Sequence, residues 1–323
     1  MAEAAEIEHL PWESKLTFAS RCKTASRLLP YAVRHMGIKP FRSTPQAKII
    51  SAGFDNWQYR RAAHDMYCEM LIQGYQQVTS MPVSPDAGLA VVLFVVFIFT
   101  FDQEFERRSQ SGKMLGYPII LATPAVSRAW QALTLYLEQF GRSESIAEHL
   151  LRTFEEHYVS YCRYLDDAVS ANSFGAVLKL VEYDSGRSML AAYEIIRLFH
   201  GHQQHQACAH QFFALGMAGK FLDDFRDVAA DVASGNPNLL YALTSEHEGE
   251  KQALEAALRE RRHIALRWWR RHCPESFGSY LDQAFAYYDQ VRSPKLQLPL
   301  DICLALLYSP QRGPSGQPSP DNR

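Results

Sequence analysis

Residues 219–240 read GKFLDDFRDVAADVASGNPNLL, and this stretch decides both the fold class and the kind of site that the sequence predicts. Asp223, Asp227 and Asp231 recur every four residues, so on a helix their carboxylates lie along one stripe, and Asp224 adds a fourth beside them. Stacked like charges destabilise a helix unless cations neutralise them. Carboxylate oxygens without His or Cys partners favour hard cations such as Mg²⁺. The stretch therefore predicts a helix that carries a magnesium site.

A simpler interpretation of the same stretch is a solvated acidic helix face, neutralised by the nearby side chains of Lys220 and Arg226. The residues before Asp223 are strongly apolar, which places the acidic stripe on a helix that otherwise belongs to the core. Both interpretations therefore agree on the helix and differ only in whether the stripe binds metal.

Beyond this stretch, the spacing of apolar residues is helical nearly throughout, and runs of alternating β-branched residues are nearly absent. Gly (17) and Pro (16) are too few for a turn-rich all-β protein. The sequence predicts an all-α fold with one helical domain over residues 1–308, roughly the first ten of them frayed, and a disordered tail over 309–323. Helices are expected over residues 56–78, 87–108, 124–140, 146–169, 174–200 with a break at 184–186, 205–234, 249–272 and 276–292, with a further segment from residue 239.

The composition excludes several classes of protein. Lys plus Arg (33) nearly balances Asp plus Glu (35), whereas a nucleic-acid-binding protein usually carries a basic excess. Six scattered cysteines without a CxxC motif, and an N-terminus without an apolar core, suit a cytoplasmic protein with reduced thiols. The most apolar run, residues 87–101, has fifteen residues, fewer than the roughly 20 that span a bilayer. We therefore expect a buried core helix there, no transmembrane segment and no nucleic-acid partner.

A second acidic cluster ends this apolar helix, where Asp102 and Glu106 lie one turn apart and share a face. If the two acidic helices face each other across a cavity, this pair would bind a shared metal–diphosphate cluster with Asp223, Asp224 and Asp227. The alternative is that the helix simply ends in solvent. The pairing of two carboxylate clusters, each at the polar end of an apolar helix, favours the shared site.

Together, the two segments resemble those of the trans-isoprenoid synthase superfamily, which contains class I terpene synthases and prenyl diphosphate synthases. Residues 102–106 (DQEFE) take the place of its first motif, and residues 223–227 (DDFRD) match its second motif in prenyl diphosphate synthases. Residues 182–187 (EYDSGR) resemble the helix break that faces the ionising diphosphate. The resemblance covers roughly residues 55–245 and implies a helical bundle around a central apolar cavity. It also implies a prenyl diphosphate substrate and two or three Mg²⁺ ions, with Mn²⁺ as a substitute.

Departures from the superfamily's pattern bear on the reaction. The first motif has only one aspartate, and the residues after the second motif, Asp231, Gly235 and Asn238, resemble the large-terpene-synthase branch. The resemblance therefore favours an atypical class I terpene synthase, a cyclase that ionises a linear prenyl diphosphate, releases diphosphate and forms a terpene hydrocarbon or alcohol. A prenyl diphosphate synthase that elongates allylic diphosphates is the first alternative. A non-enzymatic helical interaction protein on the same fold is the second.

The resemblance implies roles for residues of both acidic segments and of the helix break. The implied catalytic residues are Asp184, Gly186, Asp223 and Asp227. The implied metal ligands are Asp102, Glu106, Asp223, Asp224, Asp227 and Asp231. The groups implied to bind diphosphate are Arg187, Lys220, Arg226 and Asn238, and for Arg226 an ion pair with an acidic neighbour is an equal alternative.

Ionisation would leave an allylic carbocation, which water would quench. Ring faces stabilise cations, so we expect an apolar pocket lined by aromatic side chains. Core packing is the more frequent role of a ring on an apolar helix, and it stays the alternative for each candidate. The candidates are Phe94, Phe97, Phe101, Tyr183, Phe212 and Phe213.

Two further clusters carry weaker signals. Residues 200–210 (HGHQQHQACAH) are rich in His, but the Gly and Gln residues among them favour a turn between helices over a metal site. The arginine-rich segment 249–272 is expected to be one solvated amphipathic helix, with docking of a partner or an anionic surface as the alternative. Whether the chain forms a homodimer is left open by the sequence.

Overall fold

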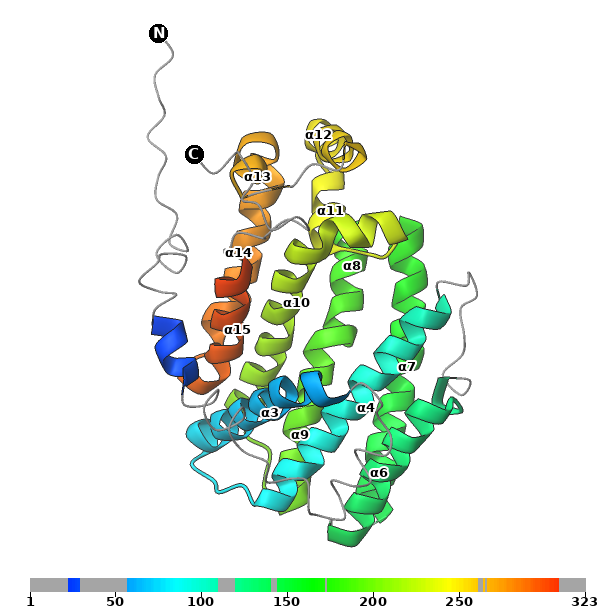
Figure 1. Ribbon diagram of the computed structural model, residues 1–323, viewed down its shortest axis with the longest axis vertical. Helices are drawn as coiled ribbons and strands as arrows, with labels where there is room; N and C mark the ends of the chain where they lie inside the picture. The colour runs from blue at the N-terminus through cyan, green and yellow to red at the C-terminus, as the bar shows by residue number, and fades with distance from the viewer. Residues whose placement is uncertain are drawn as a thin grey trace.

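The computed structural model describes residues 23–29, 57–109, 120–140, 144–171, 173–260, 264 and 266–307. Within these ranges every regular element is a helix and no strand occurs, which confirms the all-α fold (Figure 1). The expected frayed start and the expected disordered tail lie outside the described residues. Besides a short helix over 23–29, the elements are α3 (Trp57–Thr79), α4 (Pro85–Ser109), α6 (Pro124–Phe140), α7 (Glu144–Ala171), α8 (Phe174–Val181), η3 (Glu182–Arg187), α9 (Ser188–His200), α10 (Gln206–Ser234), α11 (Leu239–Ser245), α12 (Glu248–Arg259), α13 (Leu266–His272), α14 (Pro274–Gln290) and α15 (Pro294–Leu307).

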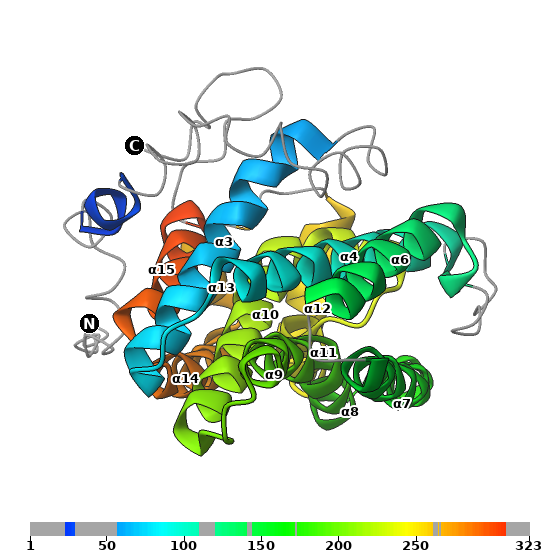
Figure 2. The same cartoon turned by 90° about the horizontal axis from the view of Figure 1, so that it is seen from below.

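The long helix α10 is the centre of the bundle. It contacts α9, η3, α11, α14 and α15. Seen from below, α9, α11, α14 and α15 lie around it (Figure 2). Phe212, Leu215, Met217 and Phe221 are buried on different sides of this helix, as its enclosed position requires. The C-terminal ends of α4 and α10 point toward the same end of the molecule (Figure 1). The fold therefore carries both acidic segments at one end of the bundle.

Helix α4 contains the most apolar part of the chain. The stretch Pro85–Phe105 is 21 residues long with a mean hydropathy of 1.9, enough by length and composition to cross a bilayer. In the fold, however, α4 packs against α3, α6 and α9, and Val91, Phe94 and Phe97 are buried. This packing supports the expectation of a core helix.

The expected helix break at residues 184–186 does not occur. Helix α8 continues through the π-helical turn η3 into α9 without interruption. A π-helical turn accommodates an extra residue without breaking the helix, and such turns are often found at functional sites. The sequence therefore located an irregularity correctly but gave it the wrong form.

In the C-terminal part of the chain, the structure differs from the predicted helices in two places. The segment 249–272, expected to be one helix, contains two helices, α12 and α13, and residue 260 forms the turn that ends the first. Helix α15 was not expected, because Pro299 lies inside it and proline lacks the N–H that a helix interior requires. Pro294 begins this helix, where the missing N–H costs nothing, and the Ser293 hydroxyl accepts a hydrogen bond from the Leu296 N–H.

Candidate functional site

Asp223 and Asp227 lie one turn apart on the partly exposed face of α10 and share one cation. The Arg226 guanidinium donates from Nη2 to Asp223 Oδ1 (2.5 Å), from Nη2 to Asp227 Oδ2 (2.6 Å) and from Nε to Asp227 Oδ1 (2.9 Å). The three side chains are 38–52% exposed, so solvent reaches the whole group. Of the two roles considered for Arg226, the structure displays the ion pair with acidic neighbours.

Asp224, the adjacent residue, faces the protein interior and is 1% exposed. Its Oδ2 accepts a hydrogen bond from the Leu239 N–H (2.7 Å), and its Oδ1 lies 3.0 Å from Lys220 Nζ. Burial raises the pKa of Asp224 to about 6, although the Lys220 cation and the Leu239 hydrogen bond oppose this shift. The Asp224 carboxylate therefore holds the start of α11 inside the protein, and its predicted role as a metal ligand stays a prediction.

Asn238 and Asp231 also have structural partners. Asn238 is the N-cap of α11: its Oδ1 accepts hydrogen bonds from the N–H groups of Leu240 and Tyr241, both at 3.1 Å. Its Nδ2 donates to the Asp224 carbonyl and to Asp231 Oδ2, both at 2.8 Å. Asn238 is therefore a buried helix cap and not a group free to bind diphosphate. The Asp231 carboxylate belongs to this cap rather than to the pair that Arg226 bridges.

Lys220 connects the acidic face of α10 with the π-helical turn. Its Nζ lies 3.0 Å from Asp224 Oδ1 and 3.8 Å from Asp223 Oδ2. Burial acts to lower the pKa of Lys220, but the charges of Asp224, Asp184 and Asp223 outweigh it and raise the pKa well above its usual range. Lys220 thus remains a cation beside the carboxylates of Asp223 and Asp224, and the charge of Asp184 on η3 adds to this effect.

A residue that sequence reasoning missed, Tyr161 of α7, lies among charges from three other elements. Burial raises the pKa of Tyr161 well above its usual range, the Asp184 and Asp102 charges raise it further, and Lys220 opposes them. Its ring packs edge-on against Phe105, with the centroids 5.7 Å apart. The Tyr161 hydroxyl is therefore influenced by charges on α4, η3 and α10. No sequence motif marks it, because it is one tyrosine among several on an amphipathic helix.

The first acidic segment, at the end of α4, is described only in part. Asp102 is exposed, and its charge reaches Tyr161. Glu106 belongs to α4, but its side chain lies outside the described residues. The predicted metal-binding roles of Asp102 and Glu106 therefore stay predictions.

In the π-helical turn, Asp184 and Gly186 have different environments. Asp184 Oδ2 accepts a hydrogen bond from Ser185 Oγ (3.0 Å), and its carbonyl accepts one from Ser188 Oγ (2.5 Å). Gly186 is buried, and a Cβ at this position would lie 2.5 Å from Phe213 Cε2. Close packing against α10 therefore accounts for this glycine, while the charge of Asp184 helps to raise the pKa of both Lys220 and Tyr161.

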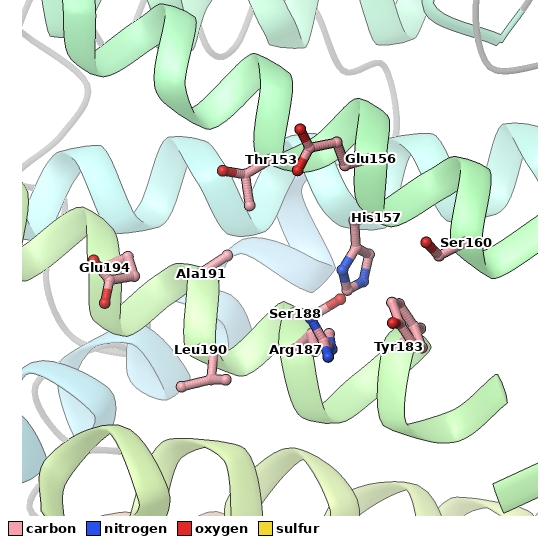
Figure 3. Close-up of a pocket in the computed structure, with 10 residues that line it drawn as sticks. All are labelled: Thr153, Glu156, His157, Ser160, Tyr183, Arg187, Ser188, Leu190, Ala191 and Glu194. Carbon is pink, nitrogen blue, oxygen red and sulfur yellow. The ribbon is translucent and has the colours of Figure 1, made fainter. Parts of the chain in front are cut away.

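A pocket of about 360 Å³ lies beside these groups, between α7 and the η3–α9 segment (Figure 3). The His157 ring extends from α7 toward Arg187 and Ser188, and its Nε2 is buried without a hydrogen-bond partner. Arg187 lies over the Tyr183 ring, 4.4 Å from its centroid. Arg187 thus faces this hollow and not the acidic pair of α10. The full lining is Thr153, Glu156, His157, Ser160, Tyr183, Arg187, Ser188, Leu190, Ala191 and Glu194.

Of the six candidate rings, only Tyr183 lines this pocket. Phe94, Phe97 and Phe212 are 0–1% exposed and fill the core, so the alternative role of core packing holds for these three. Phe101 is partly exposed and packs edge-on against Tyr158, with the centroids 5.1 Å apart. Phe213, also partly exposed, covers Gly186 as described above.

The carboxylates of α10 can be tested for whether they suit a divalent cation. In the described part of the chain, no three His, Cys, Asp or Glu side chains form a ready metal site. Asp223 and Asp227, however, already converge on a single cationic group, so their spacing suits one shared cation. Mg²⁺ is commonly bound by one or two carboxylates together with phosphate oxygens. The two residues therefore fit one Mg²⁺ ion that takes its remaining ligands from other groups.

The His-rich segment forms the turn between α9 and α10. His202 Nδ1 lies 2.9 Å from the Tyr75 hydroxyl, and His200 Nε2 accepts a hydrogen bond from the Ser84 N–H (3.1 Å). His205 is the N-cap of α10 and accepts a hydrogen bond from the Cys208 N–H. These partners give the three imidazoles structural roles, as the Gly and Gln residues of the turn suggested.

Comparison with known proteins supports the fold. No protein-family model matches the chain, and no curated protein sequence matches it. A crystal structure of geranylgeranyl pyrophosphate synthetase from Pyrococcus horikoshii Ot3 is similar with a TM-score of 0.52 at 12% identity, over 91% of this chain and 98% of that one. This likeness shows that the chain has the same helical fold as that synthetase.

Two further structures show a weaker similarity. Geranylgeranyl pyrophosphate synthetase from the archaeon Geoglobus acetivorans has a TM-score of 0.47 at 10% identity, over 93% of this chain and 100% of that one. Another geranylgeranyl pyrophosphate synthase has a TM-score of 0.48 at 12% identity, over 89% of this chain and 98% of that one.

Proposed function

We propose that this chain is an enzyme that binds a prenyl diphosphate together with Mg²⁺ and breaks its carbon–oxygen bond. One observation carries the proposal: the carboxylates of Asp223 and Asp227 converge on one cationic group, the Arg226 guanidinium, as two ligands of a shared metal ion would. Lys220, on the same helix, adds a positive charge 3.8 Å from Asp223 Oδ2. The likeness in fold to a geranylgeranyl pyrophosphate synthetase supports the same substrate class.

Each group has a distinct task in this proposal. Asp223 and Asp227 would hold Mg²⁺, and the bound ion would draw negative charge onto the diphosphate as it leaves. Lys220 offers a permanent positive charge beside Asp223, which stabilises a departing anion. The Tyr161 hydroxyl, whose pKa is well above its usual range, stays protonated and able to donate a hydrogen bond to a diphosphate oxygen.

For the fate of the carbocation we propose elongation, in which it is joined to a second prenyl unit. The structure from Pyrococcus horikoshii Ot3, whose fold this chain shares, is a geranylgeranyl pyrophosphate synthetase, which favours elongation over the cyclisation that the sequence alone favoured. Cyclisation is the second candidate. It is favoured by the single aspartate of the first acidic segment and by the two carboxylates that α10 offers to a cation, a set that suits one diphosphate site.

The test is incubation with allylic diphosphates of different chain length and Mg²⁺, with and without isopentenyl diphosphate, followed by diphosphate assay and product analysis. Asp223→Asn and Asp227→Asn should each reduce diphosphate release by about a hundredfold or more. Asp166→Asn, which changes an exposed carboxylate of α7, is the matched control and should leave release unchanged. A longer prenyl diphosphate that forms only with isopentenyl diphosphate supports elongation, and a hydrocarbon or alcohol formed without it supports cyclisation. Full turnover in both α10 variants would refute the proposed function.

A further inference from the structure

Arg226 occupies the position between two carboxylates where the proposed function requires a metal ion. Its guanidinium makes three charge-assisted hydrogen bonds, one to Asp223 and two to Asp227. Without a cation between them, the two carboxylates would stand one turn apart on a helix and repel each other. Arg226 therefore neutralises the acidic pair while no metal is bound, and a metal ion can use the same oxygens only if Arg226 moves away.

Displacing Arg226 from the two carboxylates costs little free energy, because all three side chains are exposed to water. The Arg226 side chain is 52% exposed, and its two carboxylate partners are 42% and 38% exposed. Ion pairs exposed to this degree contribute little net stability, because water solvates the separated charges well. A divalent ion can therefore compete for the two carboxylates without unfolding any element.

Lys220, the second basic residue beside these carboxylates, cannot be displaced as easily as Arg226. Lys220 pairs with the buried Asp224, and its side chain is only 25% exposed. Removing it would leave a buried carboxylate without its counter-ion, which is costly. Of the two basic residues on this face of α10, Arg226 is thus the exchangeable one and Lys220 the fixed one.

A displaced Arg226 would remain beside the site and carry a planar group suited to phosphate. A guanidinium presents parallel N–H donors that match two oxygens of a phosphate. The residue is held within the acidic segment by its own backbone, so it stays within one turn of both carboxylates.

We propose that Arg226 is an exchangeable internal cation: it pairs with Asp223 and Asp227 in the free protein, and it transfers to the diphosphate when Mg²⁺ takes over the carboxylates. This inference rests on the proposed function and deepens it, because it assigns one residue two successive partners in the same site. It predicts opposite effects of one substitution on metal binding and on diphosphate binding.

The first experiment measures Mn²⁺ binding without substrate, from the electron paramagnetic resonance signal of the free ion. Arg226→Gln should bind Mn²⁺ roughly threefold to tenfold more tightly than the unchanged protein, since the competing cation is gone. Arg226→Lys keeps the charge without the forked donors, so its Mn²⁺ affinity should lie between those of Arg226→Gln and the unchanged protein. Arg259→Gln is the matched control, because Arg259 is an exposed arginine paired with Glu255 on the same helical face of α12, and it should change nothing.

The second experiment measures thermal stabilisation by inorganic diphosphate in the presence of Mg²⁺. Arg226→Gln should lose at least half of the shift seen with the unchanged protein, whereas Arg259→Gln should retain it. Circular dichroism verifies that each variant keeps its helical content.

The outcomes separate the inference from the proposed function. Equal or weaker Mn²⁺ binding by Arg226→Gln would refute the exchange while leaving the proposed function in place. An unchanged diphosphate shift in Arg226→Gln would refute the transfer. If neither protein binds Mn²⁺ and diphosphate stabilises neither, the proposed function itself is wrong and the inference falls with it.

Discussion

Gly216 of α10 lies directly against the carbonyl oxygen of Ser185 in the π-helical turn, so close that a Cβ at position 216 would be 2.2 Å from that oxygen. The reciprocal contact places Gly186 against Phe213, also on α10. Two glycines thus bring the backbones of η3 and α10 together. This contact fixes Asp184 relative to Lys220, since each residue lies within two turns of a contact glycine on its own helix.

Replacing Gly216 by alanine should therefore destabilise the protein. The added methyl group would displace the backbone of η3, and overpacking of this kind costs about 1–3 kcal/mol. Urea unfolding followed by circular dichroism measures the effect. The matched control is Gly278→Ala in α14, where nothing lies within 4 Å of the added Cβ. That change should stabilise the protein by about 0.5–1 kcal/mol, because alanine is the better helix former. Stabilisation in both variants would contradict the described contact.

Asn238→Ala should also lower stability, because it removes the N-cap of α11 and the donor to Asp224 and Asp231. Loss of a helix cap costs about 1–2 kcal/mol, and the buried acceptor left without a partner adds to it. Urea unfolding measures the change in the free energy of unfolding. Asn236→Ala, an exposed position of the same turn, is the control and should stay within about 0.5 kcal/mol of the unchanged protein. A loss of activity in Asn238→Ala without loss of stability would instead indicate a direct role in binding.

Tyr161→Phe should reduce diphosphate release about tenfold while preserving the fold, because the ring that packs on Phe105 stays in place. The physical reason is the loss of a protonated hydroxyl that is influenced by the charges of Asp102, Asp184 and Lys220. Steady-state kinetics with an allylic diphosphate measure the change. Tyr164→Phe is the control, since Tyr164 lies on the same helix but packs on Tyr183 (4.9 Å between centroids). Equal rates in the two variants would remove Tyr161 from the site.

His157 should make stability depend on pH. Burial lowers the pKa of His157 below its usual 6.5, a hydrogen bond with the Tyr183 backbone opposes this shift, and the Arg187 charge adds to it. For a base with a lowered folded-state pKa, the stabilising contribution is complete above the unfolded-state value and is lost as pH falls through the folded-state value. Thermal unfolding between pH 7.5 and pH 5 should therefore show a smaller loss for His157→Gln than for the unchanged protein. Between pH 7.5 and pH 8.5 the two proteins should respond alike, and parallel curves over the acidic range would contradict a buried neutral imidazole.

Local regularity explains which parts of the fold the sequence predicted. The apolar spacing of α3, α4, α6 and α10 repeats over several turns, so their bounds were predicted to within a few residues. Helix α15 was missed because Pro299 breaks the pattern, although the packing of α15 against α10 and α3 keeps it helical. The π-helical turn appeared only as a break, because its form depends on a glycine contact with a helix about 30 residues further along the chain.

For the candidate site, too, some features follow from the sequence and others only from the packing of the helices. The sequence by itself determined that Asp223 and Asp227 lie one turn apart on a helix with Arg226 between them, because helical geometry fixes which residues share a face. Only the tertiary structure decided that Asp224 and Asn238 hold the start of α11, that Arg187 faces a separate pocket, and that Tyr161 receives charges from three elements. Those outcomes depend on how helices distant in sequence pack together, and a periodic pattern along one helix carries no information about the neighbour that covers it.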